Sequence, residues 1–110
     1  MRVLRIGTKL LDLELTNIPD GMEDNLHALQ KLVGGYIEPC APLELKQMGI
    51  ELLANEEGLI AGLDGNENLY PFFFVGQLVA VGLDYQAEEF VSLNDIQMEF
   101  LYDWLVKLDV

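Results

Sequence analysis

The sequence predicts a single α+β domain, in which a small mixed or mainly antiparallel sheet packs against an early short helix and a C-terminal amphipathic helix. Three observations favour this fold class. The chain has 110 residues, the usual size of one domain, and 51% of them are hydrophobic. Apolar residues alternate with polar ones in strand-like segments, and they recur at helical spacing in an early and a late segment. Strands between an early and a late helix are typical of the α+β class, so we treat residues 1–110 as one domain.

Two strands are predicted near the N-terminus. Val3 and Ile6 mark the first, and leucines alternate with polar residues over Leu11–Leu15 in the second. A hairpin through Gly7-Thr8 would connect them. The next segment, NIPDGMED, contains the proline and the glycine of a turn.

The first helix is predicted from Glu23 to Val33. Apolar residues recur at helical spacing there, the first turn is acidic, and Gly34-Gly35 supplies a C-terminal stop. His27 is expected on the polar side of this helix. Because no second histidine accompanies it, we do not expect His27 to bind a metal.

The middle of the chain is predicted to add strands to the sheet. The segment GGYIEP reads as a short strand that enters a proline-bounded loop. Ile50–Ala54 and Leu59–Leu63 are expected to form a hairpin. In its turn, Asn55 and Gly58 are expected to be present because both tolerate left-handed dihedrals.

The most apolar segment of the chain is LYPFFFVGQLVAVGL, at Leu69–Leu83. Its FFFVGQLVAVG portion is expected to be a core strand region that bends at Gly76 and is buried on both faces. The whole segment has 15 residues, fewer than the roughly 20 that a membrane span needs. No signal-peptide pattern is recognised at the N-terminus, so we expect a cytoplasmic protein.

The last helix is predicted to follow Ser92. Ser92 is expected to cap it, Asp95 to complete an S-x-x-D capping box, and Val91 to pack onto Ile96 as a hydrophobic staple. The apolar stripe expected to face the sheet consists of Leu93, Ile96, Phe100, Trp104 and Leu108.

The chain is strongly acidic. It has 19 Asp and Glu residues against 6 Lys and Arg, which gives a net charge of -13. A field of this sign repels phosphate backbones and anionic lipids, so we expect neither direct nucleic-acid binding nor membrane binding. Basic protein partners are compatible with the charge, and so is a purely solubilising role.

Few residues are candidates for catalysis or metal binding. Cys40 is the only cysteine, so it forms no internal disulfide, and we expect a buried, inert thiol. The segment DGNEN begins like a calcium loop, but Leu69 and Val75 stand where that loop needs a glycine and a bidentate acid. The motifs of nucleotide-binding and hydrolytic enzymes are absent. We therefore expect a non-enzymatic protein with no catalytic residue, no metal and no cofactor.

The last helix carries a column of acids with a tyrosine beside it, namely Asp95, Glu99, Tyr102 and Asp103. Like charges four residues apart destabilise a helix by a few tenths of a kcal/mol each. Selection for stability alone would often place lysine there. The column is therefore a candidate protein-interaction face that imitates a row of phosphates, and a merely solvated face is the alternative.

A second candidate site lies near the turn after residue 54. It would consist of Glu38, Asn55, Glu56, Glu57 and Asn66, brought together where the polar ends of strands meet. Such a site would make the protein a small-molecule- or metal-dependent ligand-binding or enzymatic domain. Against it, adjacent residues of an extended chain point to opposite faces, so the two glutamates converge only if the turn reorients them.

Four segments between Leu29 and Gln97 carry a resemblance to a known family. In chain order they are LQKLVGGYIEP, LLANEEGLIAGLDGNEN, FFFVGQLVAVG and EEFVSLNDIQ. Together they resemble a bacterial and phage family catalogued as domain of unknown function 3846. The most specific parts are V-G-G-Y-I-E, N-E-E-G and S-L-x-D-x-Q. In that family the chain after N-E-E-G continues toward L-P-x-N-R. Asn66 matches this asparagine, whereas Glu67 replaces the arginine and would lose or invert any anion contact made there.

The resemblance implies an accessory protein of phages, plasmids or their hosts, with no known reaction and no known catalytic residues. With the charge and the acid column, it leads to one hypothesis. The protein would be a non-enzymatic acidic binding protein of a phage or mobile genetic element that acts through protein partners of basic character. It would inhibit a host nucleic-acid-binding or defence protein by charge mimicry. The sequence does not indicate an oligomeric state.

Overall fold

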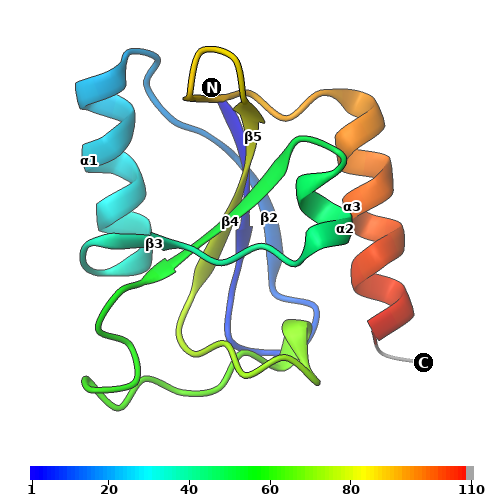
Figure 1. Ribbon diagram of the computed structural model, residues 1–110. Helices are drawn as coiled ribbons and strands as arrows, with labels where there is room; N and C mark the ends of the chain where they lie inside the picture. The colour runs from blue at the N-terminus through cyan, green and yellow to red at the C-terminus, as the bar shows by residue number, and fades with distance from the viewer. Residues whose placement is uncertain (109–110) are drawn as a thin grey trace.

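The computed structural model of the protein describes residues 1–108 and contains one antiparallel sheet with helices on both faces (Figure 1). The strands are β1 Arg2–Ile6, β2 Leu13–Asn17, β3 Ile37–Pro39, β4 Ile50–Asn55, β5 Leu78–Asp84 and β6 Glu89–Val91. The helices are α1 Met22–Val33, α2 Leu43–Lys46 and α3 Asp95–Leu108, with one turn of 3-10 helix, η1, at Glu67–Leu69.

The strands follow the order β2-β1-β5-β4-β3, and β6 pairs with the C-terminal end of β5. All five strand pairings among the described residues are antiparallel. The predicted α+β class is confirmed. The hairpin through Gly7-Thr8 is also confirmed, because β1 and β2 pair on either side of residues 7–12.

The sheet separates two apolar cores, because alternate side chains of each strand point to opposite faces. On one face, Val3, Leu53 and Val79 pack with Leu29 and Val33 of α1. On the other face, which α2, η1 and α3 cover, the buried strand residues are Leu4, Ile6, Ile50, Leu52, Leu78 and Ala80. The first five residues of β5 are all buried, so the predicted burial of this strand on both faces is confirmed.

Two apolar segments that were predicted to be strands form loops. Leu59–Leu63 forms turns instead of pairing with β4, whose partners are β3 and β5. The side chains of this segment face outward, and Ile60 is 89% exposed. The second segment, residues 72–74, was predicted to belong to the core strand. It lies in the loop before β5, because that strand begins only at Leu78. The predicted bend at Gly76 is confirmed, since its φ is 76°.

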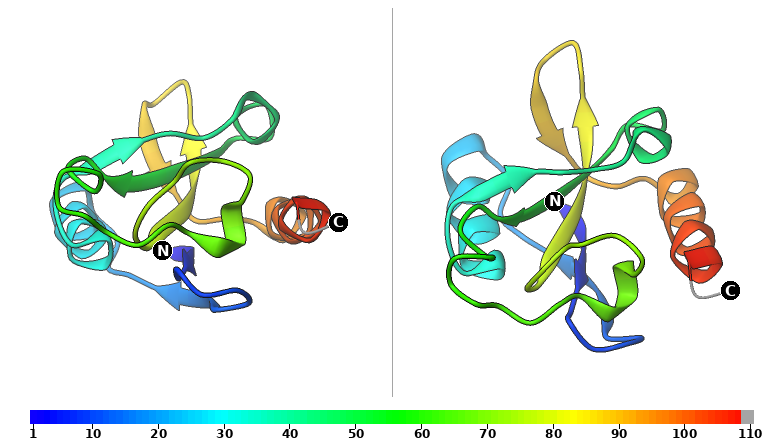
Figure 2. Two further views of the ribbon diagram at one scale, coloured as in Figure 1. Left: turned by 90° about the horizontal axis from the view of Figure 1, so that it is seen from below. Right: turned by 60° about the horizontal axis from the view of Figure 1, so that its bottom comes forward.

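Residues 56–77, between β4 and β5, cross one end of the sheet from the side of α1 to the side of α3 (Figure 2). η1 lies within this segment and contacts α3. The loop between β1 and β2, residues 7–12, lies at the same end and is hydrogen-bonded to the segment. This end of the molecule therefore brings together three segments that are far apart in the sequence.

Helix α3 is capped by Asn94, so the prediction that Ser92 caps it with Asp95 is wrong. Asn94 Oδ1 accepts a hydrogen bond from the Gln97 amide at 2.8 Å, and Gln97 Oε1 accepts one from the Asn94 amide at 3.0 Å. These reciprocal bonds form a capping box. Ser92 Oγ instead accepts a hydrogen bond from the backbone amide of Arg2 at 3.0 Å, which ties the chain before α3 to β1.

The buried face of α3 is rotated relative to the predicted stripe. Leu93 and Trp104 are buried as predicted, but Ile96, which was expected to face the sheet, is 71% exposed. The buried side chains within the helix are Met98, Leu101, Trp104 and Leu105. Phe100 and Leu108 are partly buried against them.

The first helix agrees with the prediction to within one residue, because it begins at Met22 and ends at Val33, followed by the capping residue Gly34, whose φ is 81°. His27 is exposed on it, as predicted. Within residues 1–108, no helix has the length and apolar character needed to cross a membrane.

Candidate functional site

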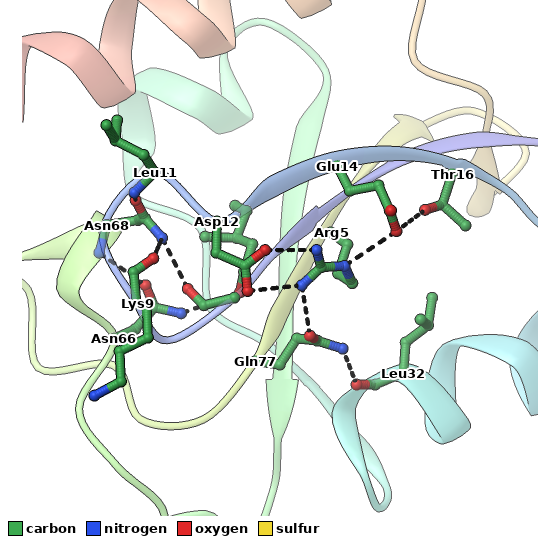
Figure 3. Close-up of polar contacts among 12 residues, drawn as sticks. Arg5, Lys9, Leu11, Asp12, Glu14, Thr16, Leu32, Asn66, Asn68 and Gln77 are labelled. Atoms are coloured by element: carbon green, nitrogen blue, oxygen red, sulfur yellow. Dashed lines mark hydrogen bonds and ion pairs between the residues drawn. The ribbon is translucent and has the colours of Figure 1, made fainter.

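Two buried asparagines, Asn66 and Asn68, hold the β4–β5 segment in place and are called the asparagine clamp (Figure 3). Asn66 Nδ2 donates hydrogen bonds to the carbonyl oxygens of Ile6 at 3.1 Å and Gly76 at 2.9 Å. Its Oδ1 accepts a hydrogen bond from the Asn68 amide at 3.1 Å. Asn66 is 4% exposed, and the polar atoms of its side chain are engaged by these backbone groups rather than by a ligand.

Asn68 binds the β1–β2 loop. Its Nδ2 donates to the carbonyl oxygens of Gly7 at 2.8 Å and Lys9 at 2.7 Å. Its Oδ1 accepts a hydrogen bond from the Leu11 amide at 2.7 Å. Because a side-chain amide has two donors and one acceptor oxygen, Asn68 uses all of its polar groups to fix the shape of this loop.

A second polar network lies on the α1 side of the sheet and starts from Arg5 (Figure 3). Arg5 pairs with Asp12 at 2.7 Å and with Glu14 at 3.3 Å, and it donates to Gln77 Oε1 at 3.0 Å. Gln77 in turn donates to the carbonyl oxygen of Leu32 in α1 at 2.7 Å. Hydrogen bonding to Arg5 holds the pKa of Asp12 below its ordinary value. The network ties β1 and β2 to α1 through Gln77, the residue before β5.

Asn55 connects the turn after β4 to the end of α1. Its Nδ2 donates to the carbonyl oxygen of Val33 at 3.2 Å, and its Oδ1 accepts from the Glu57 amide at 2.9 Å. Neither Asn55 nor Gly58 has a positive φ, so the predicted left-handed dihedrals are wrong. Gly58 is needed for space, since a Cβ there would lie 2.8 Å from Cγ2 of Val75.

The second predicted site forms only in part. Three of its five residues, Glu38, Asn55 and Glu56, line a hollow of about 350 Å³. The other two, Glu57 and Asn66, do not line it. Since the Asn55 amide is engaged with the backbone, the hollow offers two carboxylates and a largely apolar wall. In the described part of the chain, no three His, Cys, Asp or Glu residues are grouped so as to hold a metal ion.

Cys40 also lines this hollow. Burial raises the pKa of its thiol to about 12, and the negative charges of Glu51 and Glu38 add to the rise. A thiol with this pKa is almost fully protonated at neutral pH. Cys40 is therefore a poor nucleophile, as the sequence predicts.

The predicted acidic face of α3 is exposed. Asp95 pairs with Arg2, with 2.9 Å between its Oδ1 and Nη2 of the arginine. Glu99, Tyr102 and Asp103 are all exposed. Neither Glu99 nor Asp103 takes part in an ion pair among residues 1–108. Two carboxylates that form no ion pair among residues 1–108 are therefore exposed on this helix.

The sequence patterns did not predict an apolar groove of about 790 Å³ beside the asparagine clamp. The groove lies where the β1–β2 loop, the β4–β5 segment and the end of α3 meet, and its apolar lining includes Leu10, Leu59, Tyr70, Phe73, Phe74 and Leu108. The available signal was the run of three phenylalanines after Pro71, which lacks the alternation of a half-exposed strand.

The family model described as "Domain of unknown function (DUF3846)" matches residues 1–106. The chain belongs to the DUF3846 family. The resemblance from Leu29 to Gln97 therefore extends over nearly the whole chain. Comparisons with curated proteins and with solved structures give no significant match.

The motifs that carry the resemblance have structural roles in this DUF3846 protein. The N-E-E-G turn ties β4 to α1. In S-L-x-D-x-Q, Gln97 Nε2 donates to the carbonyl oxygens of Met48 and Gly49, each at 3.0 Å, and holds α3 against the turn before β4. Glu67, at the expected arginine position, accepts a hydrogen bond from the Leu10 amide at 2.8 Å. The candidates for function are therefore the surfaces beside these motifs.

Proposed function

We propose that this DUF3846 protein is a non-enzymatic, acidic binding module that acts in the cytoplasm by contact with a basic protein. In its sharper form, the protein is an accessory factor of a phage or mobile genetic element. It inhibits a host nucleic-acid-binding or defence protein by presenting carboxylates where that protein expects phosphates. The observation that carries the proposal is the exposed acidic face of α3.

Three features of this face support a role in protein contact. Glu99 and Asp103 lie about 6 Å apart along the helix axis, so their charges form a row. Tyr102 lies beside them, and tyrosine is enriched in protein interfaces. Ile96 and Val106 are 71% and 63% exposed on the same helix, and they offer apolar contacts next to the charges.

The overall charge supports the same proposal. The net charge of -13 attracts a basic partner over a distance of about a Debye length and raises the association rate. Complementary charge increases specificity and association rate more than it increases affinity. A basic groove that normally holds nucleic acid is a partner surface of the required sign.

The test is a pull-down from a lysate of the bacterial host at about 50 mM and about 500 mM salt, where screening differs strongly. The double variant Glu99→Gln, Asp103→Asn removes both unpaired charges and keeps the size of the side chains. Its matched control, Glu23→Gln, Asp24→Asn, removes two exposed charges from α1 on the opposite face of the sheet.

We expect that the low-salt partner is lost in high salt and with the α3 variant, and that the control retains it. Duplex DNA added as a competitor should displace the partner if the acids imitate phosphates. A partner that is retained equally by both variants at both salt concentrations would refute the proposal.

A second candidate function rests on the hollow that Glu38 and Glu56 line. Two carboxylates over an apolar wall are compatible with a small cationic or metal-bound ligand. Divalent ions, or nucleotides added together with a divalent ion, should then raise the midpoint of thermal unfolding, and Glu38→Gln with Glu56→Gln should abolish the rise. No rise with either class of ligand would eliminate this candidate.

A further inference from the structure

Several large aromatic and aliphatic side chains around the apolar groove are exposed to solvent. Phe73 is 95% exposed, Leu59 is 78% exposed and Tyr70 is 71% exposed, and all three line the same groove. Contiguous apolar surface on a soluble protein marks an interaction site more often than chance, because it is costly to leave in water. The groove is therefore a candidate contact surface that the acidic face of α3 does not include.

The groove is held in one shape by its surroundings. The backbone amide of Asn66 donates to the carbonyl oxygen of Phe74 at 2.8 Å, and the backbone amide of Gly76 donates to the carbonyl oxygen of Asp64 at 2.7 Å. These bonds add to the asparagine clamp below the groove. A preformed groove binds without the entropic cost of ordering a loop.

Aromatic stacking fixes the inner wall of the groove to the C-terminal helix. The rings of Phe72 and Phe74 are stacked with centroids 5.7 Å apart, and the Phe72 ring lies 5.8 Å from that of Trp104 in α3. Phe72 and Phe74 are partly buried, whereas Phe73 between them points outward. The inner wall is thus part of the core, and the outer rim is free for a partner.

The charge around the groove decides which occupant fits. The segment 56–77 carries four exposed acids, Glu56, Glu57, Asp64 and Glu67, and it contains no Lys, Arg or His. Glu67 lines the groove, whereas the nearest cations in the sequence are Lys9 and Lys107, which adjoin the lining residues Leu10 and Leu108, so acids outnumber cations around the groove. A second copy of the chain would bring the same acids and a net charge of -13, so self-association is disfavoured. Fatty acids and anionic lipids are repelled for the same reason. A protein segment with apolar anchors and flanking Lys or Arg matches both the groove and its rim.

We propose that this groove binds an apolar segment, flanked by Lys or Arg, of a partner protein. The proposal rests on the proposed function, since it assumes that the protein acts by contact with a basic protein. It adds an apolar anchor at the end of the sheet to the charged contacts of α3. Leu59 and Phe73 are the side chains that insert between the anchors of the segment.

The test selects peptides from a displayed library of random linear peptides on the wild-type protein, and then measures the affinity of one enriched peptide by fluorescence anisotropy. Leu59→Ser with Phe73→Ser removes the rim of the groove. The matched control, Met22→Ser with Leu43→Ser, removes two side chains that are 71% and 67% exposed on other helices. Circular dichroism and the thermal midpoint verify that both variants are folded.

We expect enriched peptides to combine apolar residues with Lys or Arg, and to bind the groove variant at least about tenfold more weakly while binding the control normally. Enriched peptides that lack basic residues, or that bind the folded groove variant with unchanged affinity, would overturn the proposal. So would a dimer in analytical ultracentrifugation that the groove variant abolishes, because the occupant would then be a second copy.

The α3 variant separates this proposal from the proposed function. If the partner is lost with Glu99→Gln, Asp103→Asn but is unaffected by the groove variant, the groove proposal fails and the proposed function stands. If neither variant weakens capture of the partner, both proposals fail.

Discussion

The side-chain amide of Asn55 donates a hydrogen bond to the carbonyl oxygen of Val33, 3.2 Å away, and so joins the turn after β4 to the last turn of α1. The same side chain accepts a hydrogen bond from the Glu57 amide at 2.9 Å. The acidic turn that suggested an active-site edge is therefore organised by its asparagine. The side chains of its two glutamates, Glu56 and Glu57, are exposed.

Replacing Asn55 with alanine should lower the free energy of unfolding by about 1–2 kcal/mol, because two hydrogen bonds are lost and one carbonyl of α1 loses its partner. Urea unfolding followed by circular dichroism measures the change. The neighbouring exposed variant Glu56→Gln should change the stability by less than about 0.5 kcal/mol. An Asn55→Ala protein as stable as the wild type would contradict the structural role.

Replacing Asn66 with alanine should destabilise the protein more, by about 2–3 kcal/mol, because two buried carbonyl oxygens and one amide lose their partner. The control is Glu67→Gln, which keeps an acceptor oxygen for the Leu10 amide at an exposed position. Chemical denaturation again gives the measurement. Equal effects of the two substitutions would show that the Asn66 bonds contribute little.

The role of the asparagine clamp could not be predicted from local sequence patterns, because its hydrogen-bond partners are distant in the sequence. Asn66 and Ile6 are 60 residues apart, and so the polar segment DGNEN looks like a solvated loop. Strand β5 was predictable because a continuous apolar run between turn signals indicates burial on both faces. The strand predicted at Leu59–Leu63 is wrong, since an exposed apolar run in a loop has the same local pattern as a short strand.

The start of α3 shows how two local signals can compete. Both Ser92 and Asn94 are good capping residues, and the pattern S-x-x-D favours the first. The hydroxyl of Ser92 is instead occupied by the amide of Arg2, which is 90 residues away and brought near by β1. Only the sheet topology reveals this contact. The exposure of Glu99 and Asp103 agrees with their helical spacing, whereas the ion pair of Asp95 with Arg2 again depends on the position of β1.

Asn94→Ala should therefore cost about 1 kcal/mol of stability, the usual effect of losing an N-cap. The control variant is Asn94→Asp, which keeps the capping oxygen and should retain most of the stability. If the helix were capped by Ser92, the alanine variant at residue 94 would be nearly neutral. Thermal and urea unfolding of the two variants discriminate between these outcomes.

The pairing of Asp12 with Arg5 should make stability fall in acid. Because the pKa of Asp12 is lowered in the folded state from its ordinary value of 3.8, its contribution is fully present above that value. It is lost as the pH falls through the folded pKa, where the carboxylate is protonated. The stability difference between the wild type and Asp12→Asn should therefore be constant near neutral pH and shrink below about pH 4.

Unfolding curves recorded from neutral pH to about pH 2 measure this difference. Salt at about 1 M should reduce it at neutral pH, because the pair is partly exposed and the Debye length is then about 3 Å. A difference that does not vary with pH would show that the pair leaves the Asp12 pKa unchanged.

Cys40 should react slowly with thiol reagents. A rise of its pKa from 9.0 to about 12 lowers the thiolate fraction at neutral pH roughly a thousandfold, and the thiolate is the reactive species. The rate of disulfide exchange with an aromatic disulfide should therefore be lower in the folded protein than in urea by about this factor. The comparison is Ile60→Cys in a Cys40→Ser background, since residue 60 is 89% exposed and its thiol should react at the rate of a free cysteine. Equal rates at the two positions would mean that the hollow admits the reagent and that the Cys40 thiol ionises readily. Cys40 would then be a candidate nucleophile beside Glu38.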